Sequence, residues 1–118
     1  VQFNYSLRIG VGAAKHPHRF DLGSDAPKIV IECKAHSWTE GNNAPSAKMA
    51  TWNEAMYCFS LVPADYRKMF FVLLNRRNSD VKTLATYYIS RYSHLIADGV
   101  EIWEFDETAE TATLVNPQ

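Results

Sequence analysis

The stretch KIVIECK at residues 28–34 constrains the fold most, because a short apolar run after turn residues is typical of a β-strand. Side chains of a strand alternate between its two faces, so Glu32 and Lys34 share one face, whereas Ile31 and Cys33 share the other. A carboxylate and an ammonium group therefore lie side by side at the end of an apolar strand. The face that carries them must be hydrated, ion-paired or bound to an ion.

The rest of the chain predicts strands and helices in a definite order. Strands are expected at 3–12, 18–24, 27–38, 67–75 and 100–105, with a short edge strand near 111–115. A first helix is expected over 46–61, where Met49, Trp52, Met56 and Phe59 recur at helical spacing, and a second between a cap at Ser79 or Asp80 and Gly99. The apolar run at 67–75 is typical of a strand buried on both faces. The order β-β-β-α-β-α-β predicts an α/β or α+β fold with a mixed central sheet flanked by helices.

Length and composition narrow the class of protein. The chain has 118 residues, 47% of them hydrophobic, which predicts one globular domain over 1–118. No apolar run is long enough to cross a membrane, and the N-terminus lacks a secretory pattern, so we expect a cytoplasmic protein with no membrane partner. Cys33 and Cys58 show no metal or disulfide spacing and are expected in the core. The net charge of −1 argues mildly against binding to nucleic acid.

Asp21 gives Glu32 and Lys34 a partner. It lies on the strand before KIVIECK, flanked by Phe20 and Leu22, which are expected to face away from it. If the two strands form a hairpin, the carboxylates of Asp21 and Glu32 come within reach of each other and repel unless a cation lies between them. Oxygen ligands suit Mg²⁺ or Mn²⁺ rather than zinc, and a nearby lysine can stabilise charge developing on a phosphate. This combination indicates phosphodiester hydrolysis.

The segment from FD at 20–21 through IVI to ECK at 32–34 resembles the PD-(D/E)xK nuclease superfamily, which has the restriction-endonuclease-like fold. The resemblance covers residues 3 to about 105. It implies a metal-dependent DNA endonuclease of the restriction, repair or recombination type. Asp21, Glu32 and the backbone carbonyl of Cys33 would be ligands of Mg²⁺, with Mn²⁺ as a substitute. Lys34 would position or activate the attacking water.

The same resemblance implies auxiliary features. The helix after the ECK triplet often adds a polar residue to the site, for which Lys48 is the loose match, and His36 is a second auxiliary candidate. Phe20 stands where the family has proline, and the family's N-terminal helix, which often supplies another acid, has no counterpart in this chain. A duplex cutter of this size is expected to act as a homodimer on DNA.

Several features have a simpler interpretation. Asn42 and Asn43, with Arg76 and Arg77, are candidate DNA contacts, but turn chemistry and a hydrated charged turn explain them equally well. Glu32 and Lys34 could form an ion pair on a hydrated face. Two alternative functions follow, a catalytically inactive module on the same fold that binds nucleic acid or protein, and a small interaction protein with no nucleic-acid role.

Overall fold

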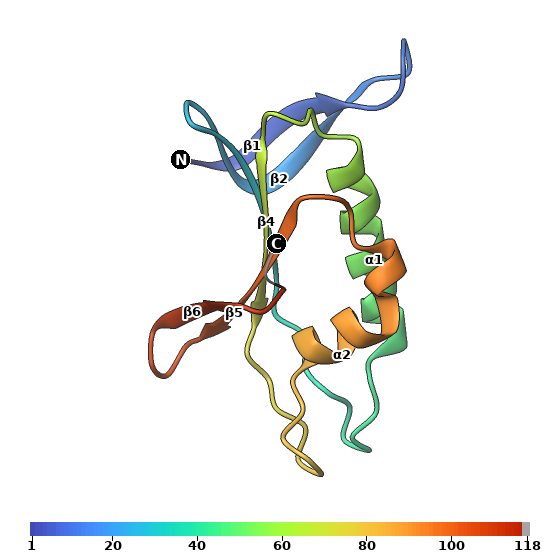
Figure 1. Cartoon of the computed structure of the whole chain (residues 1–118), viewed down its shortest axis with the longest axis vertical. Coiled ribbons are helices and arrows are strands. Elements are labelled where there is room, and N and C mark those ends of the chain that lie inside the picture. The colour runs from blue at the N-terminus through green and yellow to red at the C-terminus, as the bar shows by residue number, and fades with distance from the viewer. Residues whose placement is uncertain (117–118) are drawn as a thin grey trace.

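The computed structural model describes residues 1–116, which form one six-stranded sheet and two α-helices (Figure 1). The strands are β1 (Gln2–Ile9), β2 (His16–Asp25), β3 (Lys28–Lys34), β4 (Arg67–Leu73), β5 (Val100–Asp106) and β6 (Thr111–Leu114). The helices are α1 (Ser46–Ser60) and α2 (Leu84–Tyr92), and a short 3₁₀ turn, η1 (Ser93–Leu95), follows α2. No helix among the described residues is long and apolar enough to cross a membrane.

The strands lie in the sheet in their sequence order, β1-β2-β3-β4-β5-β6. β3, β4 and β5 are parallel neighbours, whereas the β1–β2, β2–β3 and β5–β6 pairs are antiparallel. The predicted mixed sheet is therefore confirmed, within an α+β fold. The crossovers through α1 and α2 step in the same direction along the sheet, and right-handed crossovers of this kind place both helices on one face. Figure 1 shows both helices on the same side of the sheet.

The core lies between that face and the helices. The predicted apolar stripe of α1 is confirmed, because its four residues are all buried: Met49, Trp52, Met56 and Phe59. Trp52 packs edge-on against Phe70 of β4, with ring centroids 5.5 Å apart, and Tyr88 of α2 lies 5.1 Å from the Trp52 ring. Trp52 and Tyr88 therefore serve the core rather than a surface for stacked bases.

Within residues 1–116 the opposite face of the sheet carries no helix, so both helices that flank the sheet lie on one side of it. The expectation that β4 is buried on both faces is wrong: Phe70 and Val72 are fully buried under the helices, whereas Phe71 remains partly exposed. Cys33, expected in the core, is exposed on this open face, and Cys58 of α1 is half-buried; both are free thiols. The apolar composition of the strands does not indicate on which side of the sheet the crossovers run. Because both run along one side, the open face could not be predicted from the sequence.

The N-caps of both helices differ from those that the sequence indicates, which are Ser46 for the first helix and Ser79 or Asp80 for the second. α2 begins later than expected, with Thr83 as its N-cap, whose hydroxyl accepts a hydrogen bond from the Thr86 N–H at 3.2 Å. Asp80, the predicted cap, instead forms an ion pair with Arg77. At α1, Pro45 takes the N-cap position rather than Ser46, without a side-chain cap.

Candidate active site

β2 and β3 separate at the point where the predicted residues lie, and we call this point the fork. The two strands pair from Asp25↔Lys28 to Leu22↔Ile31 and no further. Beyond that pair, Asp21 of β2 faces Glu32 and Cys33 of β3. The Asp21 N–H donates to Glu32 Oε1 at 3.2 Å, and the Cys33 N–H donates to Asp21 Oδ2 at 2.8 Å. Side-chain carboxylates thus accept hydrogen bonds from main-chain donors at the place where the ladder stops.

A slip in the strand alternation places Asp21 at the fork. Phe20 stacks on Phe59 of α1, with ring centroids 5.7 Å apart, so it lies on the helix side. Leu22, two residues on, lines the open face beside Ile31. The prediction that Phe20 and Leu22 share a face is therefore wrong. On β1, Asn4 lies opposite Asp21 with a φ of +53°, a left-handed conformation that asparagine tolerates and that breaks the regular pleat.

Glu32 is the group most perturbed by this arrangement. Burial raises its pKa to about 7, and repulsion from the nearby Asp21 carboxylate adds to the rise. The Asp21 N–H hydrogen bond and the charge of Lys34 act in the opposite direction, but they do not offset the burial. A cation beside the partly buried Glu32 carboxylate and the nearby Asp21 carboxylate would be stabilised by their negative charge.

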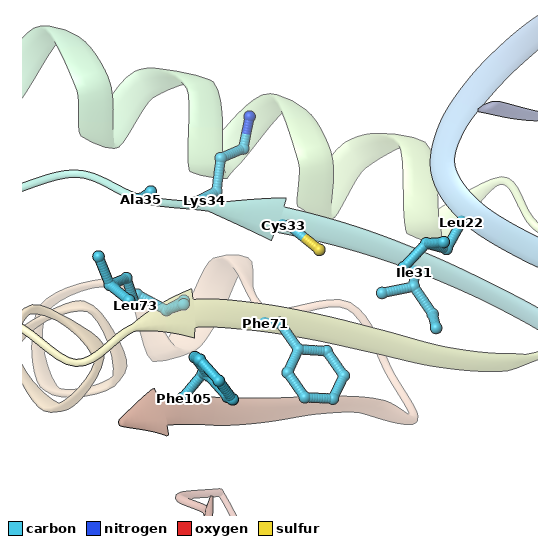
Figure 2. Close-up of a pocket in the computed structure, with 9 residues that line it drawn as sticks. Leu22, Ile31, Cys33, Lys34, Ala35, Phe71, Leu73 and Phe105 are labelled. Carbon is cyan, nitrogen blue, oxygen red and sulfur yellow. The ribbon is translucent and has the colours of Figure 1, made fainter. Parts of the chain in front are cut away.

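Glu32 and Lys34 open onto a common polar cavity of about 250 Å³ between β2, β3 and α1. The other lining side chains come from β2 and α1: His18, Thr51, Glu54, Ala55 and Cys58. Figure 2 shows the Lys34 side chain pointing toward α1, on the side of β3 opposite to Cys33. The ion pair between Glu32 and Lys34 is not formed, because neither side chain takes part in the ion pairs among residues 1–116. Both side chains face the cavity.

The donor set fits one hard divalent cation rather than a fully side-chain-ligated metal. Within residues 1–116, no three His, Cys, Asp or Glu side chains gather as a metal-binding group. The fork offers two carboxylates, each with one oxygen outside its hydrogen bond to the main chain. Mg²⁺ retains several waters and is commonly held by one or two carboxylates, which is the number that Asp21 and Glu32 offer.

The auxiliary candidates lie close by but have other partners. His36 Nδ1 accepts the hydrogen bond of the fully buried Trp52 indole N–H at 2.8 Å, and the two rings stack. Burial lowers the pKa of His36, and the charges of Lys34 and Lys48 lower it further. Lys48 is exposed in the first turn of α1. The site role of both residues stays a prediction, whereas the structural role of His36 toward Trp52 is clear.

The predicted DNA-contact residues lie in two loops. Asn42 and Asn43 form a turn in which the Asn43 N–H donates to Thr39 Oγ1 at 3.0 Å. The Arg77 guanidinium pairs with Asp80 and lies 4.7 Å from the Trp38 ring centroid, so its charge already has two partners. The Arg76 side chain is exposed. Turn chemistry accounts for Asn42, Asn43 and Arg77, and their contact with DNA stays a prediction.

Sequence reasoning missed the cavity walls that α1 and β2 provide. Thr51, Glu54 and Cys58 follow one another at spacings of three and four along α1, a polar stripe beside the apolar one that could have been found. His18 lies in β2, within the strand expected at 18–24, and its Nδ1 lies 3.8 Å from Cys58 Sγ, but its place in the cavity wall was not predicted. No protein-family model, no curated protein and no solved structure matches this chain.

Proposed function

We propose that this chain is a metal-dependent DNA endonuclease with a restriction-endonuclease-like core. The observation that carries the proposal is the fork itself, where the Asp21 N–H donates to the Glu32 carboxylate and the Cys33 N–H donates to the Asp21 carboxylate. Lys34 opens from the next position of the same strand face onto the same cavity as Glu32. The resemblance of residues 20–34 to the PD-(D/E)xK superfamily supports the same function.

Each residue has a distinct task in this proposal. Asp21, Glu32 and the carbonyl of Cys33 would hold a Mg²⁺ or Mn²⁺ ion, which supplies Lewis acidity toward the phosphate and lowers the pKa of a water. The hydrogen bond from the Cys33 N–H fixes the Asp21 carboxylate. Lys34 is an ammonium group directed into the cavity, where it orients a water or stabilises negative charge that develops on the phosphate. A cut in both strands needs two such sites, which the predicted homodimer supplies.

The test is metal-dependent nicking of supercoiled plasmid by the purified protein. We expect cleavage with Mg²⁺ or Mn²⁺ and none with EDTA. Glu32→Gln and Lys34→Ala should each lower the rate by at least about a hundredfold, as expected for groups that act at the reacting centre. The matched control is Glu40→Gln, which removes an exposed carboxylate from the loop after β3. Full activity in Glu32→Gln would exclude this site.

A second candidate function keeps the same fold but has no catalytic activity. Each carboxylate at the fork already accepts a main-chain hydrogen bond, so the pair also explains how the strands separate without orphaned donors. In that case the chain is a binding module for nucleic acid or protein. Tight DNA binding without cleavage in Mg²⁺ or Mn²⁺, together with no Mn²⁺ binding by calorimetry, would favour it over the nuclease.

A further inference from the structure

The β1–β2 hairpin extends beyond the rest of the sheet. β1 pairs with β2 as far as Ile9↔His16, whereas β3 leaves β2 at Leu22. Residues 5–20 therefore have no third strand beside them, and we call this segment the arm. In Figure 1 the tip of the arm, between β1 and β2, projects past α1 at the upper edge of the molecule.

The charge of the arm differs in sign from that of the remaining chain. Residues 1–20 contain three of the twelve basic residues, namely Arg8, Lys15 and Arg19, and none of the thirteen acidic ones. The remaining chain carries nine basic residues against thirteen acidic ones. The near-neutral net charge therefore conceals a basic arm attached to an acidic body.

The basic side chains of the arm face away from the core. The pairs Ser6↔Arg19 and Arg8↔Pro17 place Arg8 and Arg19 on one face of the hairpin. Tyr5 and Ile9, which alternate with them, are buried at 4% and 8% exposure. Among residues 1–116, neither Arg8, Lys15 nor Arg19 belongs to an ion pair. Their charges are thus available to a partner.

The base of the arm leads directly into the candidate site. His18 lines the same cavity as Glu32 and Lys34. Arg19 precedes Asp21 by two residues, a distance of about 7 Å along an extended strand. Arg19 lies on the face of β2 opposite to His18, so a polyanion on the outer face of the arm approaches the exposed Asp21 from the side of the sheet opposite to the cavity.

We infer that the arm binds the phosphate backbone of duplex DNA beside the fork, an inference that rests on the proposed nuclease function. Guanidinium groups bind phosphates through paired hydrogen bonds, and a row of separate basic side chains suits a chain of regularly spaced phosphates. The arm then supplies the sequence-independent part of DNA affinity. This surface is distinct from the loops that carry Asn42 and Arg76.

The test measures binding of a fluorescent DNA duplex in EDTA by anisotropy, over a series of salt concentrations. The triple variant Arg8→Gln, Lys15→Gln, Arg19→Gln should bind at least tenfold more weakly than wild type near 0.1 M salt. The slope of log K against log salt should fall by up to about 2.7, since each phosphate contact contributes about 0.9. The control Lys68→Gln, Lys82→Gln, Arg91→Gln removes three charges outside the arm that belong to no ion pair within residues 1–116, and it should keep the wild-type slope.

A second variant separates binding from folding. Arg8 Nη2 donates to the Lys15 carbonyl at 2.8 Å, so its loss can loosen the tip. Within residues 1–116, neither the Lys15 nor the Arg19 side chain forms an ion pair, so Lys15→Gln, Arg19→Gln should lower the slope by up to about 1.8. An unchanged slope in both arm variants would overturn the inference. It would also be overturned if the arm variants lost binding to phosphatidylserine vesicles but kept wild-type binding to DNA. Reduced binding by the arm variants, with no cleavage by wild type in Mg²⁺, would retain the arm and refute the nuclease alone.

Discussion

The two faces of β3 differ in chemical character, since one is lined by charged side chains and the other by apolar ones. One face opens onto the polar cavity beneath α1, with Glu32 and Lys34 in its wall. The other face, with Ile31 and Cys33, belongs to an apolar groove of about 480 Å³ that no helix covers (Figure 2). A single strand therefore separates a charged site from an exposed hydrophobic surface.

This difference follows from the topology. Because both crossovers run on one side of the sheet, the helices supply the cavity with a polar wall and leave the far side without partners. β4 repeats the pattern: Phe70 and Val72 point into the core, whereas Phe71 and Leu73 point into the groove. The alternation of side chains along a strand decides which face of the sheet each residue lies on. The position of the helices decides which of the two faces becomes the core. Equivalent substitutions on the two faces should therefore have unequal effects.

The largest contrast is expected between two adjacent phenylalanines of β4. Phe70 is fully buried against Trp52 and Phe59, so Phe70→Ala should lower the free energy of unfolding by about 3–5 kcal/mol. Phe71 is partly exposed and stacks mainly on Trp103, so Phe71→Ala should cost about 1–2 kcal/mol. Urea unfolding of both variants measures the difference. Equal losses would contradict the assignment of one face to the core.

A pH-dependent contrast of up to about 2–3 kcal/mol is expected from Glu32. Its pKa is raised to about 7 in the folded protein, so between pH 4.5 and 7 the folded state binds more protons than the unfolded state. The contribution of Glu32 to the free energy of unfolding is therefore most favourable at low pH and is lost as the pH rises toward 7. His36, whose pKa is lowered, acts with the opposite sign in part of this window.

The contribution of Glu32 is isolated by comparison with Glu32→Gln. As the pH rises from 4.5 to 8, the unfolding free energy of wild type should fall relative to that of Glu32→Gln by up to about 2–3 kcal/mol. Chemical denaturation at four or five pH values measures it. A constant difference over that range would show that Glu32 is not perturbed by Asp21 and burial.

The sequence predicted which residues meet at the fork better than it predicted their surroundings. Asp21 meets Glu32 as expected, because two strands joined by a tight turn bring residues at matched distances from it together. The alternation slip at Asp21 was not predictable, and it lies next to the left-handed Asn4 of a different strand, a pairing that the sequence of β2 alone does not indicate. The open face was also not predictable, because apolar residues in a strand do not indicate which side of the sheet the helices cover.

The helix side of the site was predicted only in part. The apolar stripe of α1 could be read from spacing alone, and it places Trp52 in the core as expected. Which strands the polar stripe of α1 would face depends on the angle at which α1 crosses the sheet, and spacing does not determine that angle. Thr51 and Glu54 were missed for this reason.

A smaller effect is expected where the site meets the core, at His36. The imidazole accepts the hydrogen bond of the buried Trp52 indole, so His36→Ala leaves that N–H without its partner and should cost about 1–3 kcal/mol. His94→Ala, at an exposed position on the 3₁₀ turn, should stay within about 0.5 kcal/mol of wild type. Thermal and urea unfolding compare the two. An equal, small effect would mean that water replaces the imidazole.

The smallest effect should appear in the chemistry of the two thiols, which lie on opposite sides of the sheet. Cys33 is exposed at the groove, whereas Cys58 is half-buried in the cavity wall near Glu54 and Glu32. Burial raises the pKa of both thiols, and nearby carboxylates raise each further, so neither is a strong nucleophile. Exposure should then decide the order, and Cys33 should react several-fold faster with an aromatic disulfide reagent. Comparison of the Cys33→Ser and Cys58→Ser variants assigns the two phases, and a faster Cys58 would show that the cavity is more open to solvent than the groove.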